Sequence, residues 1–426
     1  FGTESNAMSG SGTADDPYVI TSASDIAAMH SDLGASYILG SDINLIGYKH
    51  KPIGDESEGA FTGSLDGKGH TISNLYINLP DNKYAGLFGY FEGTVNNVKF
   101  SSVDITGGRY IGTVAGNAGA GSSVTHCDVL SGRVRTLGYP MEICIGGVVG
   151  LCEGTLDVCN NAASVSSSTS DASTNAGGLI GAAKNSMEIN NSTNAGKVSV
   201  SGNGKCGGLI GYSNSVLKIY NCKNSGAVTR ENVFYSTSIQ SGGIIGEVYS
   251  IELTGCSNSG NINGYDAGGL ILIAQRAVIY DCSNMGKVSA HNAAGLIVSG
   301  YVEIGNCVNL GNVDAYKNGG GIIANGIYGI ISNSINYADI KGSDDLSGYR
   351  SGIAGELDGG VINTCKNYGN IYGGCGQAAG IVCDVKNISK CINYGNITDN
   401  TTRYKTYALT SDLLSNHLPI LPHFIE

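Results

Sequence analysis

The sequence has no tryptophan, only 6 prolines, and few charged residues, which make up 14% of its 426 residues. Ordinary soluble domains carry about 25% charged residues. No stretch reaches the ~18 apolar residues that a membrane-spanning helix needs, so we predict no membrane insertion. Asp and Glu outnumber Lys and Arg by 35 to 24, and the net charge is −11. This balance disfavours phosphate backbones, so we expect no nucleic-acid partner.

Glycine, in contrast, is abundant, with 66 residues that follow no collagen-like period. Hydrophobic residues make up 41% of the chain. A disordered chain would have low hydrophobicity, so the composition is not that of a disordered protein. It suits a fold with many tight turns and short strands.

Two short patterns alternate along the chain, and successive copies lie 25 to 34 residues apart, most often near 26. The first, C-x-N-x-G-x-V/I, begins at Cys222, Cys256, Cys282, Cys307, Cys365 and Cys391, with weaker copies at Cys127, Cys159, Ser192 and Ser334. The second, GG-L/I/V-I/V-G, occupies 146–150, 177–181, 207–211 and 242–246, with degenerate copies at 86–89, 112–116, 268–271, 295–298, 320–323, 352–355 and 380–382. About eleven copies in one register predict a repeat architecture.

The repeats predict strands rather than helices. Each unit contains short runs rich in Ile, Val, Tyr and Thr, bounded by Gly or Asn. No unit has a long apolar pattern at helical spacing, which excludes helical repeats, and the leucine-rich and hexapeptide signatures are missing. We therefore predict an all-β protein, a single right-handed parallel β-helix of about a dozen coils. At ~4.8 Å per coil, the rod would be roughly 60 Å long.

Each recurrent residue has an expected role. The Gly that follows C-x-N-x is expected at a corner with positive φ. The recurrent Asn is expected to bond neighbouring backbone or the Asn one coil away. Eight of the thirteen cysteines share one repeat position and are expected to form a buried, inward column of reduced thiols. A few disulfides remain the alternative, whereas the lack of any C-x-x-C pair argues against a metal site.

The two ends of the repeat region differ from its middle. A β-helix must cover its terminal coils, so we expect caps at both ends. Ser22 to Asp25 form a capping box that opens a short helix, in which Ile26, Met29 and Leu33 share one face. The predicted organisation is an expression-tag remnant at 1–8, an N-terminal cap at 9–36, the β-helix at 37–408, and a C-terminal cap at 409–426.

The chain resembles bacterial surface proteins that carry the GLUG motif, over about residues 11 to 405. Besides the GGLIG copies, the resemblance rests on segments 16–20 (DPYVI), 24–29 (SDIAAM), 37–45 (YILGSDINL), 61–75 (FTGSLDGKGHTISNL) and 85–89 (AGLFG). It implies a right-handed β-helix that is secreted or attached to the bacterial cell surface and has an adhesion-like role. The motif also accompanies the peptidase domain of some surface proteases, but no protease motif is present here. The resemblance supplies no catalytic residues.

We therefore expect an extracellular or surface-attached binding protein, a monomer without cofactor or metal, whose partner is a glycan or an extracellular host protein. A polysaccharide-cleaving enzyme is the alternative, because enzymes of that kind also use this architecture. They need clustered carboxylates on one sheet, and the sequence offers no such cluster in register, so we expect no catalytic residues. A structural stalk without a ligand is the third possibility.

Binding is predicted at one edge of the solenoid. Between the G-x-V strand and the next GGLIG, four coils insert longer loops, at 135–145, 166–176, 229–241 and 341–351. Insertions at one point of a repeat gather on one edge, where repeat proteins commonly bind. Aromatic and Arg side chains in these loops suit sugars or peptides. The predicted ligand-binding residues are Tyr139, Arg230, Phe234, Tyr235, Tyr349 and Arg350.

Overall fold

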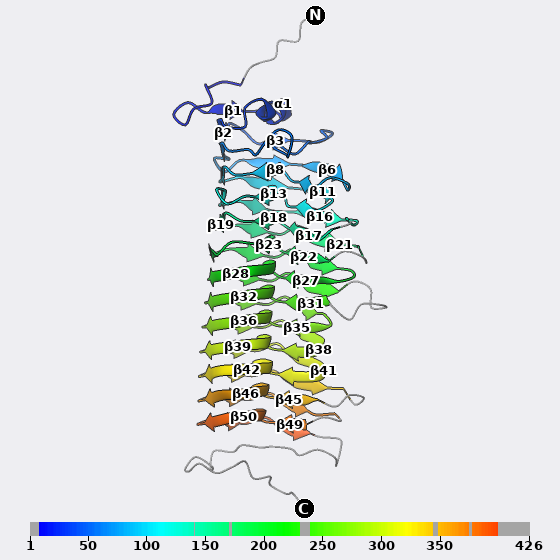
Figure 1. Ribbon diagram of the computed structural model, residues 1–426, viewed down its shortest axis with the longest axis vertical. Coiled ribbons are helices and arrows are strands. Elements are labelled where there is room, and N and C mark those ends of the chain that lie inside the picture. The colour runs from blue at the N-terminus through cyan, green and yellow to red at the C-terminus, as the bar shows by residue number, and fades with distance from the viewer. Residues whose placement is uncertain are drawn as a thin grey trace, which may run out of the picture.

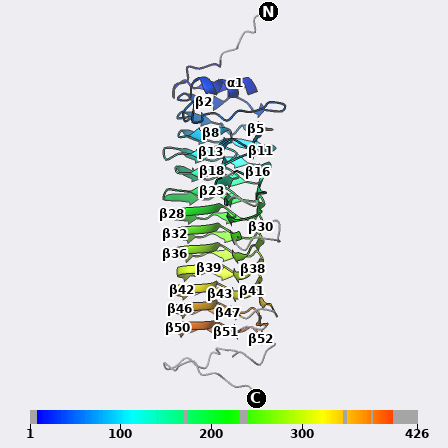
Figure 2. The same ribbon diagram turned by 45° about the vertical axis from the view of Figure 1, so that its right-hand side comes forward.

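The chain forms a parallel β-helix of about 12 turns with one short helix near its N-terminus (Figures 1 and 2). The structure is a computed structural model that describes residues 8–139, 141–169, 173–230, 239–343, 348–374 and 377–398. In Figure 1 the near strands run from right to left as the chain descends, which makes the winding right-handed. The predicted fold class is confirmed. The predicted C-terminal cap at 409–426 and residues 1–7 of the predicted tag remnant lie outside the described residues.

The coils build four parallel sheets, of which sheet A is confined to the N-terminal coils. Sheet A contains β1 (Tyr18–Ile20), β2 (Ser36–Leu39), β4 (Ser64–Asp66), β9 (Thr94–Asn96), β14 (Ser123–Thr125) and β19 (Thr155–Asp157). Sheet B contains β3 (Ile43–Asn44), β5 (Thr71–Ser73), β10 (Lys99–Ser101), β15 (Asp128–Val129), β20 (Asn160–Asn161), β25 (Thr193–Asn194), β29 (Lys223–Asn224), β33 (Ser257–Asn258), β37 (Ser283–Asn284), β40 (Val308–Asn309), β43 (Ile335–Asn336), β47 (Lys366–Asn367) and β51 (Ile392–Asn393).

Sheet C receives two strands from most coils, separated by the corner at which the four long loops were predicted. It contains β6 (Tyr76–Leu79), β7 (Tyr84–Ala85), β11 (Val103–Gly107), β12 (Tyr110–Ile111), β16 (Gly132–Thr136), β17 (Ile143–Gly146), β21 (Ser164–Ser167), β22 (Thr174–Gly177), β26 (Val198–Val200), β27 (Gly204–Gly207), β30 (Val228–Arg230), β31 (Ile239–Gly242), β34 (Ile262–Asn263), β35 (Asp266–Gly268), β38 (Val288–Ala294), β41 (Val313–Gly320), β44 (Ile340–Gly342), β45 (Tyr349–Ser351), β48 (Ile371–Tyr372), β49 (Gln377–Ala379) and β52 (Ile397–Thr398).

Sheet D carries the GGLIG strands and changes shape along the rod. It contains β8 (Phe88–Phe91), β13 (Ala115–Ala118), β18 (Val149–Cys152), β23 (Ile180–Ala183), β24 (Met187–Asn190), β28 (Ile210–Tyr220), β32 (Ile245–Thr254), β36 (Ile271–Tyr280), β39 (Ile297–Gly305), β42 (Ile323–Ser332), β46 (Ala354–Asn363) and β50 (Val382–Ser389). From β28 onward, one long strand replaces the two shorter strands of the earlier coils. Register shifts between Ser213 and Val216, and between Ala274 and Arg276, mark irregularities in these long strands, and such irregularities bend a sheet.

The N-terminal end is closed by a helical turn, as predicted. α1 (Ala23–Ala28) and the 3₁₀ turn η1 (Met29–Ser31) form the single helical segment of the described residues. The Ser22 hydroxyl accepts the Asp25 N–H, and the Asp25 carboxylate accepts the Ser22 N–H at 2.9 Å, which confirms the capping box. Ile26 and Met29 are fully buried against the first coils. The helix therefore covers apolar surface that the first coil would otherwise expose.

The recurrent Asn residues form one buried ladder along the inside of sheet B. The Nδ2 atom of each ladder Asn donates to the Oδ1 atom of the Asn in the next coil, at 2.7 to 2.9 Å. It also donates to the carbonyl two residues ahead, for example from Asn258 to Gly260 at 2.8 Å. The predicted ladder is confirmed, and its members are Asn161, Asn194, Asn224, Asn258, Asn284, Asn309, Asn336, Asn367 and Asn393.

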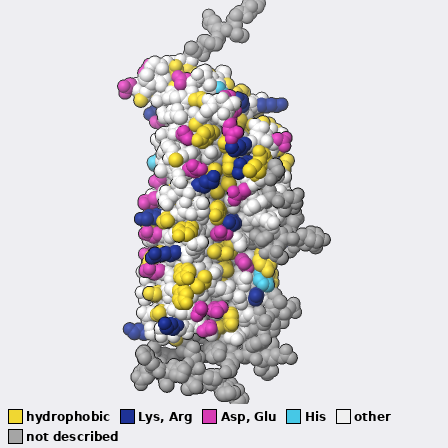
Figure 3. All heavy atoms as spheres, viewed as in Figure 1, with side chains coloured by type: hydrophobic (Ala, Val, Ile, Leu, Met, Phe, Trp, Pro, Cys, Tyr) yellow, Lys and Arg dark blue, Asp and Glu magenta, His cyan; other side chains and the backbone are white. Residues whose placement is uncertain are grey.

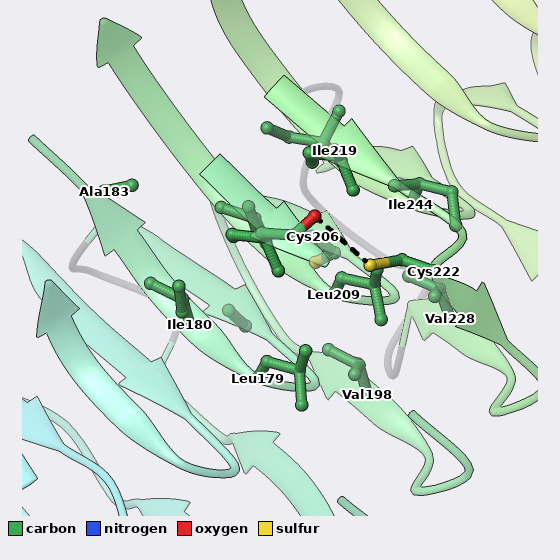
Figure 4. Close-up of a cluster of buried hydrophobic side chains, with 14 of the residues drawn as sticks. Leu179, Ile180, Ala183, Val198, Cys206, Leu209, Ile219, Cys222, Val228 and Ile244 are labelled. Carbon is green, nitrogen blue, oxygen red and sulfur yellow. Dashed lines mark hydrogen bonds between the residues drawn. The ribbon is translucent and has the colours of Figure 1, made fainter. Parts of the chain in front are cut away.

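The cysteine column lies beside this ladder, inside the helix. In Figure 4, Cys222 lies among the aliphatic side chains of neighbouring coils. Its thiol donates to the Tyr220 carbonyl at 3.3 Å and accepts the Ser192 N–H at 3.3 Å. Ser192 replaces cysteine in the column, and its hydroxyl accepts the Cys159 N–H at 3.1 Å. A thiol and a hydroxyl thus make the same bonds here, which explains the weaker repeat copies that begin with Ser.

One expectation about the repeat is wrong. The Gly of C-x-N-x-G does not adopt positive φ; instead, a Cβ atom on Gly286 would overlap the carbonyl oxygen of Gly260 in the preceding coil. Glycine is therefore required there because successive coils stack closely. The left-handed residue is the one before the column cysteine, such as Asn221 or Asp281, both with φ of 55°. Asn and Asp tolerate that conformation better than most residues.

Candidate functional site: a groove lined by tyrosines

The four predicted loops connect β16 to β17, β21 to β22, β30 to β31, and β44 to β45, which are equivalent strands of sheet C. Each loop includes residues outside the described ranges. Their role as one binding edge stays a prediction. Two of the predicted binding residues, Phe234 and Tyr235, lie outside the described residues.

The remaining loop aromatics are only partly exposed. Tyr139 packs against the main hydrophobic core, and its ring lies close over Gly108. Tyr349 is partly buried in β45, and burial is the main reason why its pKa is raised. Arg230 is a partly buried residue at the end of β30. Several coils separate β17 from β45 along sheet C, so the structure does not bring Tyr139 and Tyr349 together.

Arg350 was predicted to be an exposed donor, and this placement is wrong because its side chain is fully buried. Nη2 donates to the Tyr316 carbonyl at 2.8 Å, and Nη1 donates to the Gly348 carbonyl at 3.4 Å. Glycine at position 342 leaves room for the guanidinium, since a Cβ atom there would lie 2.6 Å from Nε. A buried charge needs such partners. Arg350 therefore binds backbone carbonyls of the corner.

A groove of about 640 Å³ lies on the outer face of sheet D, across five consecutive coils from β28 to β42. Figure 3 shows hydrophobic side chains gathered on this face over β39 and β42. The groove, called the tyrosine groove below, is lined by Val216, Tyr249, Ser250, Gln275, Arg276, Ala277, Tyr301, Val302, Glu303, Tyr328, Gly329 and Ile330. The lining residues come from the irregular part of these long strands, where equivalent side chains of successive coils are register partners.

Two of the tyrosines in the groove are neighbours on adjacent coils. Tyr301 and Tyr328 are register partners in β39 and β42; their ring centroids are 5.7 Å apart and their planes differ by 19°. The Tyr328 ring extends over Gly359 in the next coil, where any Cβ atom would overlap it. Both residues are 48% exposed. About half of each side chain is therefore accessible to a ligand.

Polar groups at the groove are few. Arg276 and Gln275 are exposed side chains of β36, and Ser250 lies one coil earlier. Glu303 accepts a hydrogen bond from the Tyr280 hydroxyl at 2.6 Å, and this bond is the main reason why the pKa of Tyr280 is raised. A groove with apolar rings and a few directed polar groups is typical of a ligand-binding surface.

This groove was not predicted from the sequence, although the repeat contains a signal for it. Val216, Ser250, Arg276, Tyr301 and Tyr328 are register partners, each six residues before the Cys or Ser of its repeat copy. Aligning the copies on that residue would have shown two adjacent tyrosines on one face. The prediction concentrated instead on insertions, and the groove strands contain none.

One pair of carboxylates was also not expected. Glu356 of β46 and Asp384 of β50 are register partners on adjacent coils. Burial, and then the charges of Asp384 and Asp358, raise the pKa of Glu356. The sequence predicted no such carboxylates in register. Within the described ranges, no group of His, Cys, Asp and Glu side chains is arranged to hold a metal ion.

No helix in the described part of the chain is long and apolar enough to cross a membrane.

No protein-family model matches the chain. Among solved structures, the chain is similar to a "putative immunoglobulin A1 protease" from Bacteroides ovatus, with a TM-score of 0.46 and 21% identity over 59% of this chain and 78% of that one. A similarity at this level carries no functional information.

Two curated proteins share part of the sequence. Halomucin of Haloquadratum walsbyi is 36% identical in an alignment of 165 positions that covers 35% of this chain and 2% of halomucin. A "Putative Gly-rich membrane protein" of Evansella cellulosilytica is 33% identical in an alignment of 121 positions that covers 25% of this chain and 14% of that protein. The chain thus matches a small fraction of the length of either relative. Its similarity to both is confined to part of its own length.

Proposed function

We propose that the protein is a secreted or surface-attached adhesion protein that binds a glycan in the tyrosine groove. The observation that supports this most is the pair of half-exposed tyrosines, Tyr301 and Tyr328, which are register partners on the outer face of sheet D with Arg276 beside them. Sugar rings have apolar faces and polar edges, so they match flat aromatic surfaces flanked by hydrogen-bonding groups. Tyrosine also offers this contact area at low conformational-entropy cost.

The surface location is supported by two lines of similarity. One partial relative is named halomucin and the other is named a Gly-rich membrane protein. We propose in addition that the chain belongs with the GLUG-motif surface proteins that its repeats resemble. A rigid solenoid suits an extracellular role because its binding face does not depend on mobile elements.

Replacing both Tyr301 and Tyr328 with Ser should lower the affinity for a glycan at least about tenfold. Truncating an aromatic residue at the centre of a binding site typically costs more than about 1 kcal/mol, and two such residues are removed here. A glycan array would identify the ligand, and titration calorimetry would give the affinities. Circular dichroism should show unchanged secondary structure, because both rings lie outside the core.

The chain offers a matched control for this experiment. Tyr337 and Tyr368 are also stacked on adjacent coils, with ring centroids 4.9 Å apart, and both are exposed next to sheet B. Replacing both with Ser should leave glycan binding unchanged. Equal loss in the two double variants would contradict the groove. Loss of binding with Tyr139→Ser alone would place the site on the loop edge instead.

Glycan cleavage is the second candidate, because Glu356 and Asp384 lie in register. Paired carboxylates serve as acid and base in many glycosidases. We expect no products when the protein is incubated with pectins, glycosaminoglycans and host glycans, because this pair does not line the groove in which we propose that the glycan binds. Mass spectrometry would detect cleavage. Products that disappear in Glu356→Gln would overturn this expectation and establish an enzyme.

A further inference from the structure

We propose that the glycan held in the tyrosine groove carries carboxylate groups and that Arg276 binds one of them. This inference rests on the proposed function, since it specifies the ligand of the same groove. Three features support it: the exposed charge of Arg276, the register of Arg276 with the two tyrosines, and the planar geometry of the guanidinium group.

Arg276 is a positively charged residue that lines the groove. It is exposed in β36, and among the described residues its side chain makes no ion pair and no hydrogen bond. The two carboxylates of the neighbouring coils have other contacts: Glu252 lies 3.9 Å from the Lys218 ammonium, and Glu303, which also lines the groove and keeps its negative charge, accepts the Tyr280 hydroxyl. The groove therefore has one charged donor available for a ligand.

The register aligns this donor with the two rings. Arg276 pairs with Tyr301, and Tyr301 pairs with Tyr328, so the three side chains lie in one row along the rod. Adjacent coils are ~4.8 Å apart, which is close to the advance of one sugar unit in an extended chain. A carboxylate bound by Arg276 would place the following sugars over Tyr301 and Tyr328. The ligand would then lie parallel to the rod axis.

The guanidinium group of arginine matches the geometry of a carboxylate group. Its planar group donates two parallel hydrogen bonds to the two carboxylate oxygens. The protein as a whole carries a net charge of −11, so an anionic polymer is repelled by most of its surface. A carboxylated glycan would therefore be held where Arg276 is located, rather than adsorbed along the rod. A sulfated glycan is the alternative source of negative charge.

The test compares carboxylated tetrasaccharides from galacturonan, hyaluronan and alginate with the same molecules after methyl esterification, which removes the charge and keeps the sugar rings. We expect at least one acid form to bind the wild-type protein about tenfold or more tightly than its ester. Arg276→Gln should abolish this preference. Arg276→Lys should restore only part of it, because an ammonium group cannot make the paired contact. Lys218→Gln, on the same face, should leave it unchanged.

Four other results would contradict the carboxylate inference, and one of them would also contradict glycan binding. Equal binding of acid and ester would overturn this inference and leave the proposed glycan binding in place. A stronger response to a heparin-derived sulfated tetrasaccharide than to every carboxylated one would overturn the choice of carboxylate. Absence of binding to any neutral or anionic glycan on an array would overturn both proposals. Persistence of the acid preference in Arg276→Gln would show that another group recognises the charge.

Discussion

Gly269→Ala should destabilise the β-helix by about 3 kcal/mol or more, because the added methyl group has no space. A Cβ atom at Gly269 would overlap the Gly295 carbonyl oxygen of the next coil and would lie 2.5 Å from the Asn284 side-chain amide carbon. The same relation recurs along the rod, where the second Gly of GGLIG lies against a ladder Asn, as Gly208 does against Asn224. Thermal unfolding followed by circular dichroism would measure the loss.

A matched glycine tests whether this loss comes from the close approach. A Cβ atom at Gly34 would meet its nearest neighbours at 3.8 and 3.9 Å, which is ordinary contact. Gly34→Ala should therefore change the melting temperature little. If both alanine variants had the melting temperature of the wild type, the close packing of the Gly269 backbone against the Asn ladder would not contribute to stability.

Asn284→Ala is expected to have the second large effect, a loss of at least about 3 kcal/mol. The change removes the bonds from Asn284 Nδ2 to Gly286 O and to Asn309 Oδ1, both at 2.9 Å, and the bond that Asn258 Nδ2 donates to Asn284 Oδ1 at 2.8 Å. Each buried polar group left without a partner costs about 1–3 kcal/mol. Hydrogen exchange should report faster opening of β33, β37 and β40 than of distant coils, because each coil contacts only its neighbours.

Asn312 provides the control, because it is an exposed Asn in the same repeat region. Its side chain accepts one hydrogen bond, from the Asp339 N–H at 3.2 Å. Asn312→Ala should cost less than about 1 kcal/mol, since water can replace the lost acceptor. Similar losses at positions 284 and 312 would contradict a special role for the buried ladder.

Much of the fold could be predicted because the same residue pattern recurs in successive coils. The C-x-N-x-G pattern placed Cys222 and Asn224 correctly inside the coil, and the Ser22–Asp25 capping box placed the helix. The role of Gly286 was misjudged because glycine serves two purposes, positive φ and close approach, and the pattern alone does not separate them. The relation between Gly269 and Asn284 was not visible, since it joins two patterns through contact between coils.

The candidate site was less predictable for a physical reason. Insertions such as 229–241 are obvious in a sequence, whereas a groove made by uninterrupted strands depends on which side chains share a column. Tyr301 and Tyr328 are 27 positions apart in the sequence, and only their pairing in register makes them neighbours. Arg350 was misplaced because burial of a charge depends on carbonyl groups from another coil, here that of Tyr316.

The direction of the bonds between coils has a mechanical consequence. Strand pairing and the Asn ladder both point along the rod, so they resist the separation of one coil from the next. A pull applied at one strand would load the bonds of one coil interface, and these would open in succession from that point. A polymer bound along the tyrosine groove would contact several coils at once. Tension from such a ligand would be shared among their interfaces, so the anchorage would yield at a higher force than a contact with a single loop.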